Sequence, residues 1–126
     1  MHSLMVKKDF IASHFLIGGD WGNENKPHAH HYVLELILEG ETLDHNNYLV
    51  DIVEVEAAMN ELILGYKNRL LNDLEDFVGR NPSIELFSKI LCTAMSGRIK
   101  DPRISALKAV LWENESAWAG YGIRRS

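Results

Sequence analysis

The sequence predicts an α+β fold in which two strands come first, two helices follow, and two strands end the chain. Between residues 30 and 39, apolar and polar side chains alternate, which is the period of a strand with one buried face. Apolar residues in 53–64 and 84–94 recur instead at the spacing of one helix face. Apolar residues fill 46% of the 126 positions, enough for the packed core of a single domain spanning 1–126.

The first part of the chain predicts two strands joined by a polar loop. We expect the first strand over residues 6–17, where Gly18 and Gly19 break it. Residues 21–27 are polar and indicate a loop. The second strand is expected over 30–39, with its tyrosine and leucines on one face and its glutamates on the other.

The middle of the chain predicts a first helix over residues 53–64. Its apolar positions form one stripe, and Gly65 lies where such a helix would stop. Residues 66–79 mix leucines with acidic and amide side chains, and this mixture leaves their structure open.

A second helix is expected to begin near residue 81. Asn81 followed by Pro82 is a start signal, because asparagine suits the cap and proline suits the first helical position. Gly97 is expected to close this helix. Residues 104–112 and 118–123 then predict the two final strands.

Composition excludes several classes of partner. The net charge of −5 argues against a nucleic-acid ligand, because phosphate binding needs a basic face. No apolar run approaches the length of a membrane span, and no apolar leader segment begins the chain. The single cysteine, Cys92, rules out a disulfide within the chain and is expected to be a buried small apolar residue. We therefore expect a cytoplasmic protein with no nucleic-acid or membrane partner.

Three histidines are the strongest functional signal in the sequence. Side chains two residues apart in a strand point to the same face, so His28 and His30 share a face to which a neighbouring strand could add His14. Three imidazoles with an open fourth position are the usual layout of a catalytic zinc site. The alternative is a set of scattered strand histidines held by hydrogen bonds. In either case His31 should point to the opposite face.

Six short motifs occur here in an order found in one known enzyme family. They are Phe10-Ile11-Ala12-Ser13-His14, His28-Ala29-His30-His31-Tyr32, Asn47-Tyr48-Leu49-Val50-Asp51-Ile52, Leu71-Asn72, Pro82-Ser83-Ile84-Glu85 and Glu113-Asn114. Together they resemble the 6-pyruvoyltetrahydropterin synthase and 6-carboxytetrahydropterin synthase family over nearly the whole chain. The resemblance implies a tunnelling fold (T-fold): a four-stranded antiparallel sheet with two helices on one face, associating into a homotrimer or a homohexamer.

The resemblance also implies a site between subunits. Zn2+ would be held by His14, His28 and His30, and the pterin ring by Glu113 with help from the turn near Ser83. A carboxylate suits the ring because it can accept two N–H bonds from an amino-pyrimidine edge. The alternative for Glu113 is an exposed charge at the end of a strand.

The proton-transfer residues of the family are not matched. Its cysteine, four residues before the first histidine of the pair, corresponds to Glu24, and its Asp-His pair corresponds to Lys67 and Asn68. A side-chain-cleaving variant of the family has a glutamate where this chain has Asn25. A carboxylate in a partly dry cleft can act as a base. Glu24 is therefore the candidate catalytic residue, with an ordinary solvated loop acid as the alternative.

The resemblance thus implies a zinc-dependent lyase acting on a reduced pterin, 7,8-dihydroneopterin triphosphate or a close relative. The reaction stays open between synthase chemistry and side-chain cleavage to 6-hydroxymethyl-dihydropterin. A pterin-binding paralogue that has lost catalysis is a further alternative, because the family's cysteine and Asp-His pair are absent. A different purine or pterin ligand is another, since a fold does not fix a function.

Overall fold

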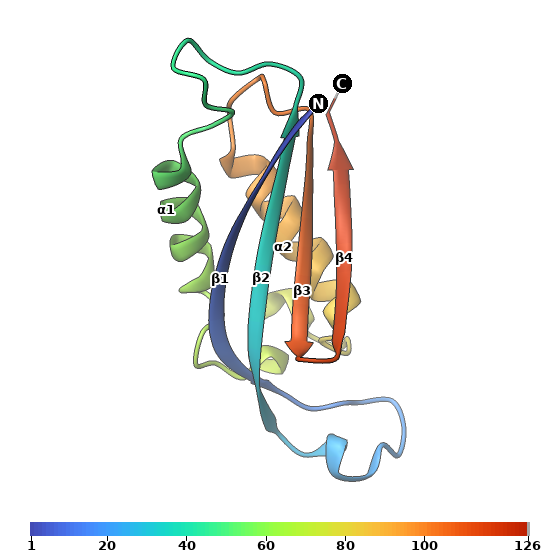
Figure 1. Cartoon of the computed structure of the whole chain (residues 1–126). Coiled ribbons are helices and arrows are strands. Elements are labelled where there is room, and N and C mark those ends of the chain that lie inside the picture. The colour runs from blue at the N-terminus through green and yellow to red at the C-terminus, as the bar shows by residue number, and fades with distance from the viewer. Residues whose placement is uncertain (126) are drawn as a thin grey trace.

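Two helices lie against one face of a four-stranded antiparallel sheet in the computed structural model of the chain, which describes residues 1–125 (Figure 1). The sheet order is β1-β2-β3-β4. The elements are β1 (His2–His14), β2 (His28–Gly40), α1 (Ile52–Ile63), α2 (Ile84–Arg98), β3 (Ala106–Asn114) and β4 (Ala117–Arg124), with short 3-10 turns η1 (Gly22–Asn25), η2 (Leu71–Asp73) and η3 (Glu75–Phe77). The predicted α+β class and order of strands and helices are confirmed.

The hairpin of β1 and β2 is longer than the rest of the sheet. The two strands pair along their whole lengths, up to His14 opposite His28, whereas β3 pairs with β2 only as far as Val33. Residues 28–32 therefore extend past β3. Together with the end of β1 they form an arm that projects beyond the β3–β4 turn (Figure 1). The three predicted histidines lie on this arm.

The helix-facing side of the sheet forms the hydrophobic core. Tyr32, Leu34, Leu36 and Leu38 alternate along β2 and are fully buried, as the sequence predicted. The helices cover the sheet with buried side chains, which are Val55, Met59, Leu62 and Ile63 of α1 and Phe87, Ser88, Leu91, Cys92 and Met95 of α2. Each fully buried leucine contributes about 1.5–3 kcal/mol relative to exposure. Because the even-numbered residues of β2 pack against the helices, the even-numbered residues of the arm face the helix side as well.

The first strand ends earlier than the sequence predicted. It was expected over 6–17, but β1 begins at His2 and ends at His14. Beyond that point the backbone binds amide side chains: Asn72 accepts from the Phe15 N–H and donates to its carbonyl, and Asn81 does the same for Ile17. These side chains take the place of a neighbouring strand, so extended chain continues without ladder pairing.

The start of the second helix was also predicted wrongly. Ser83 is the cap in place of Asn81, and its hydroxyl oxygen accepts from the Leu86 N–H at 3.1 Å. Asn81 is not available because its amide holds the chain after β1. Gly97 does not end the helix but lies within the last turn, which closes at Arg98.

The remaining bounds differ slightly from expectation. α1 begins one residue earlier than predicted because the Asp51 carboxylate caps it by accepting from the Val53 N–H. The stretch 66–79, which the pattern left open, contains the turns η2 and η3. Within residues 1–125, no helix is both long enough and apolar enough to cross a bilayer.

Candidate metal centre and substrate cleft

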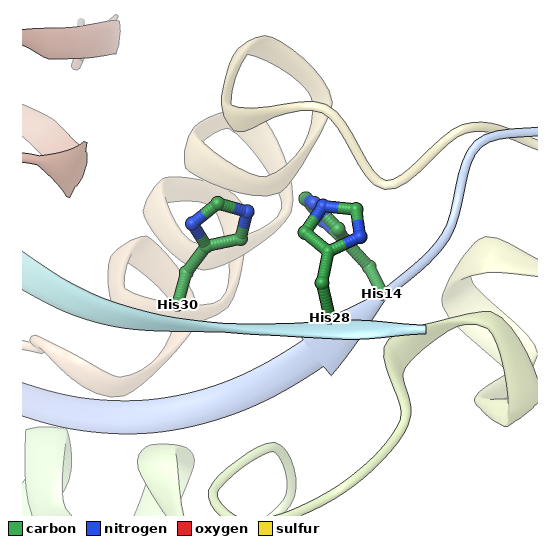
Figure 2. Close-up of side chains that lie close together, drawn as sticks. All are labelled: His14, His28 and His30. Atoms are coloured by element: carbon green, nitrogen blue, oxygen red, sulfur yellow. The ribbon is translucent and has the colours of Figure 1, made fainter. Parts of the chain in front are cut away.

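Three imidazole rings converge on one side of the arm (Figure 2). His14 lies opposite His28 in the strand register and His30 follows two residues later, so strand geometry places all three on the same face. Ring centroids are 4.6 Å apart for His14 and His28, 4.7 Å for His14 and His30, and 5.0 Å for His28 and His30. His31 points to the opposite face, as expected, and pairs there with Asp9.

The nitrogens at the centre of this triad lack hydrogen-bond partners. Nε2 of His14, His28 and His30 are the only buried side-chain nitrogen or oxygen atoms in that condition within residues 1–125. An unpaired buried polar atom costs about 1–3 kcal/mol. One ring nitrogen of each histidine lies within 4.8 Å of those of the other two. Three converging imidazoles of this kind fit a shared divalent cation such as Zn2+.

The opposite nitrogens of two of the rings are held by oxygen atoms. Nδ1 of His14 lies 3.1 Å from the Tyr32 hydroxyl, and Nδ1 of His28 lies 2.8 Å from the Lys26 carbonyl. A ring whose Nδ1–H donates to oxygen keeps its lone pair on Nε2, where a metal binds. Sequence reasoning assigned Tyr32 to the core alone. The signal that could have revealed its second role is that it shares a strand face with His30.

Burial lowers the pKa of His14 to about 4, and the neighbouring His30 and His28 act in the same direction. The Pro82 carbonyl and the Glu24 carboxylate raise this pKa, but by less. The His14 ring is therefore neutral at neutral pH. That is the protonation state a metal ligand needs.

Two carboxylates flank the triad. Oε1 of Glu113 lies 3.0 Å from Nε2 of His30 and 3.5 Å from Nε2 of His14, and its side chain is 24% exposed. Oε2 of Glu24 lies 3.6 Å from Nε2 of His28, and its side chain is 60% exposed. The structure thus brings both predicted glutamates to the triad, one partly buried and one at the solvent edge.

Glu24 reaches the triad although it stands one position from the glutamate of the cleaving variant. The residue at that position, Asn25, is used for structure: its amide donates to the Leu16 and Gly19 carbonyls and accepts from the Trp21 N–H. These hydrogen bonds hold the turn η1 against residues 16–19, which follow β1. The carboxylate next to it is consequently directed toward His28.

The other predicted substrate-binding residue, Ser83, lies at the start of α2. Its side chain is half-buried and its hydroxyl oxygen caps the helix. Lys67 and Asn68, which replace the family's Asp-His pair, form the turn after α1. There Asn68 adopts a positive φ of 60°, and its N–H donates to the Ile11 carbonyl. In this chain Asn68 therefore joins the turn after α1 to β1 through a backbone hydrogen bond.

A cavity of about 560 Å³ opens at the end of β3, mostly on the face of the sheet opposite the triad. His30 and Glu113 border it, and the open-face residues that line it are Lys7, Ala29, His31, Val33, Glu35 and Trp112. Small-molecule sites typically measure about 300–1,000 Å³. Trp112 lies against Trp118 with ring centroids 6.2 Å apart. It also forms a wall of the cavity, a role the sequence did not indicate.

The chain resembles known proteins in sequence and in fold. The model of the family described as 6-pyruvoyl tetrahydropterin synthase matches residues 3–123. A curated relative, the 6-carboxy-5,6,7,8-tetrahydropterin synthase of Bacillus subtilis (strain 168), is 32% identical over 79 residues. That alignment covers 60% of this chain and 51% of the relative, so it spans about half the relative's length.

Solved structures share the fold over nearly the whole chain. The 6-pyruvoyl tetrahydropterin synthase of Caenorhabditis elegans has a TM-score of 0.82 at 17% identity, covering 99% of this chain and 96% of its own. A catalytic-residue mutant of the Plasmodium vivax enzyme has a TM-score of 0.82 at 13% identity, covering 98% of each chain. At these identities the likeness establishes the T-fold. With the family model matching almost every residue, the chain belongs to the 6-pyruvoyl tetrahydropterin synthase family.

Proposed function

We propose that the chain is a zinc-dependent enzyme whose substrate is 7,8-dihydroneopterin triphosphate or a close relative. The main support is the convergence of three buried imidazole nitrogens that have no hydrogen-bond partner among the described residues. His30 and Glu113 border a cavity with the volume for a bicyclic ring and a side chain. Family membership supplies the substrate class.

Each site residue has a role in this proposal. His14, His28 and His30 hold Zn2+, which when bound would make the side-chain hydroxyls of the substrate more acidic. Glu113 accepts two N–H bonds from the amino-pyrimidine edge of the ring, a geometry that a carboxylate provides well. Ser83 can donate its O–H to the substrate while its oxygen continues to cap α2.

Glu24 is the proposed base. Its carboxylate lies 3.6 Å from the His28 ring and is open to solvent, so a substrate hydroxyl beside the ligands would be within its reach. The proton of that hydroxyl passes to the carboxylate when the O–H bond breaks. The Plasmodium vivax relative is described as having a glutamate as a catalytic residue. This favours side-chain cleavage, with a 6-hydroxymethyl product, as the second candidate beside synthase chemistry.

We further propose a homotrimer or homohexamer in the cytoplasm. β1 and β4 are the outer strands of the sheet, each paired on one side among residues 1–125. Open strand edges pair readily with other chains. Pairing of β1 with β4 of a neighbouring copy would continue the sheet toward a closed barrel and bring that copy alongside the arm. A single buried cysteine suits a reducing compartment.

Product analysis tests the proposal. The zinc-loaded protein is incubated with 7,8-dihydroneopterin triphosphate, and products are identified by mass spectrometry. A 6-pyruvoyl or 6-carboxy product supports synthase chemistry, a 6-hydroxymethyl product supports cleavage, and tight binding without turnover indicates a binding protein. Absence of both binding and turnover contradicts the pterin assignment. Light scattering of the same sample measures the number of subunits.

The role of Glu24 is tested separately. Glu24→Gln keeps the shape of the side chain but removes the base, so turnover should fall about 10²–10⁴-fold while substrate binding persists. Glu54→Gln is the matched control, because Glu54 is exposed in the first turn of α1. Turnover of Glu24→Gln equal to that of the control would remove Glu24 from the mechanism.

A further inference from the structure

Glu113 is placed by an irregularity in the hairpin of β3 and β4. Trp112 pairs with Trp118 and Asn114 pairs with Ala117, so the register shifts between the two pairs. In the register of the described strands, Glu113 consequently has no residue opposite it. Such a bulge redirects a side chain, and bulges are over-represented beside active sites. Here the redirected carboxylate lies against the histidine triad.

The carboxylate is close to two imidazoles without hydrogen bonding to either. Oε1 lies 3.0 Å from Nε2 of His30 and 3.5 Å from Nε2 of His14. Both nitrogens nevertheless lack a hydrogen-bond partner within residues 1–125, so the oxygen lies off the direction in which the rings would donate. Two ligands bound to a tetrahedral zinc ion at about 2.0–2.1 Å are about 3.3 Å apart. The carboxylate oxygen is therefore spaced from both nitrogens as ligands around one ion are.

Glu24 does not share this arrangement. Its carboxylate approaches one ring only, at 3.6 Å from His28, and its side chain is 60% exposed against 24% for Glu113. A carboxylate that is partly buried and near two ligand atoms is the better candidate for a place on the ion. The bulge supplies the reason why this residue, and not a neighbour on the hairpin, reaches it.

We propose that Glu113 is the fourth metal ligand of the substrate-free protein and that the pterin ring removes it from the ion on binding. This inference rests on the proposed pterin function. The carboxylate oxygen that binds the ion cannot at the same time accept the ring N–H. On ring binding the Glu113 carboxylate would turn to the ring N–H groups, and the position it leaves on the ion would be open to a substrate hydroxyl. A closed site thus becomes an open, catalytic one only when substrate arrives.

Metal affinity and ligand-field spectra test the first half of the proposal. Co2+ replaces zinc, and its visible spectrum reports the ligand set; zinc affinity is measured against a chromophoric chelator. Glu113→Gln should weaken zinc binding at least about tenfold and change the Co2+ spectrum. Glu115→Gln, which removes the same charge two residues away on the hairpin, should change neither. Wild-type affinity and spectrum in Glu113→Gln, with circular dichroism confirming its fold, would overturn the inference.

The exchange is tested with 7,8-dihydropterin, which carries the ring without the C6 side chain. Adding it to the Co2+ protein should shift the wild-type spectrum and leave that of Glu113→Gln unchanged. Ring binding that leaves the wild-type spectrum unaltered overturns the exchange while the proposed function stands. Failure of the wild-type protein to bind metal or dihydropterin contradicts the proposed function itself, and this inference with it.

Discussion

The hydroxyl of Tyr32 offers a sharp test of how the metal centre is held. It lies 3.1 Å from Nδ1 of His14, and both side chains are buried, at 0% and 3% exposed. If His14 binds the ion through Nε2, its Nδ1–H donates to this oxygen, which fixes the tautomer and the plane of the ring. Tyr32→Phe removes the oxygen and keeps the aromatic ring in its place among the core side chains.

Two separate losses are expected from this change. In the metal-free protein, Nδ1 of His14 is left buried without a partner, which costs about 1–3 kcal/mol of unfolding free energy. In the metal-bound protein the ring loses its orienting contact, and such partners are worth about 10–100-fold in metal affinity. At about 1.4 kcal/mol per tenfold, that is roughly 1.4–2.8 kcal/mol of binding free energy.

Tyr66→Phe separates a positioning role from simple packing. The Tyr66 hydroxyl is partly buried and donates to Asp76 at 2.7 Å, so its hydrogen bond involves no residue of the triad. Chelator competition and urea unfolding are measured on both variants. Both should lose stability, but only Tyr32→Phe should lose zinc affinity. Wild-type zinc affinity in Tyr32→Phe would refute the positioning role, whatever the stability data show.

Three further changes probe the fold, Asn72→Ala near the end of β1 and the other two at the end of the sheet opposite the triad. Asn72→Ala removes both hydrogen bonds to the Phe15 backbone and should lower the unfolding free energy by about 1–3 kcal/mol in urea titrations. Gly40→Ala should cost about 1–3 kcal/mol in the same assay, because the new Cβ would collide with the Arg103 carbonyl. The hydrogen bond from Arg103 lowers the pKa of Asp101, so its stabilising effect is present above pH 3.8 and lost as pH falls through the lowered pKa. The stability gap between wild type and Asp101→Asn should close over that acidic range.

The architecture was predictable because burial imposes a period on the sequence. The alternation from Tyr32 to Leu38 identified β2 and its core face, and the stripe of 53–64 identified α1. The limits of elements were harder to predict, because they depend on partners distant in sequence. Asn81 has the residue type of a helix cap, but its side-chain oxygen accepts from the Ile17 N–H. Ser83 therefore caps the helix in its place.

Strand spacing alone indicated only the histidines of the candidate site, and the glutamates were expected from the resemblance. Spacing two residues apart placed His28 and His30 on one face, and the register of a hairpin brought His14 opposite. The position of Glu113 depends on a bulge between β3 and β4 that the local sequence pattern does not indicate. Its role against the pterin ring came from resemblance, whereas its closeness to the triad required the pairing of β2 with β3.

The phase of β2 links the metal centre to the core. Every second residue from Leu38 back to Tyr32 faces the core. His30 and His28 continue this series on the same face, beyond the point where β3 ends. A slip of one residue in this strand would bury His31 and turn the other two rings to the open face, at the cost of exposing the leucines. Because that cost is the hydrophobic energy of the core, the packing of β2 against the helices also holds the direction of the ligands. Ligand geometry should therefore persist as long as the sheet remains folded.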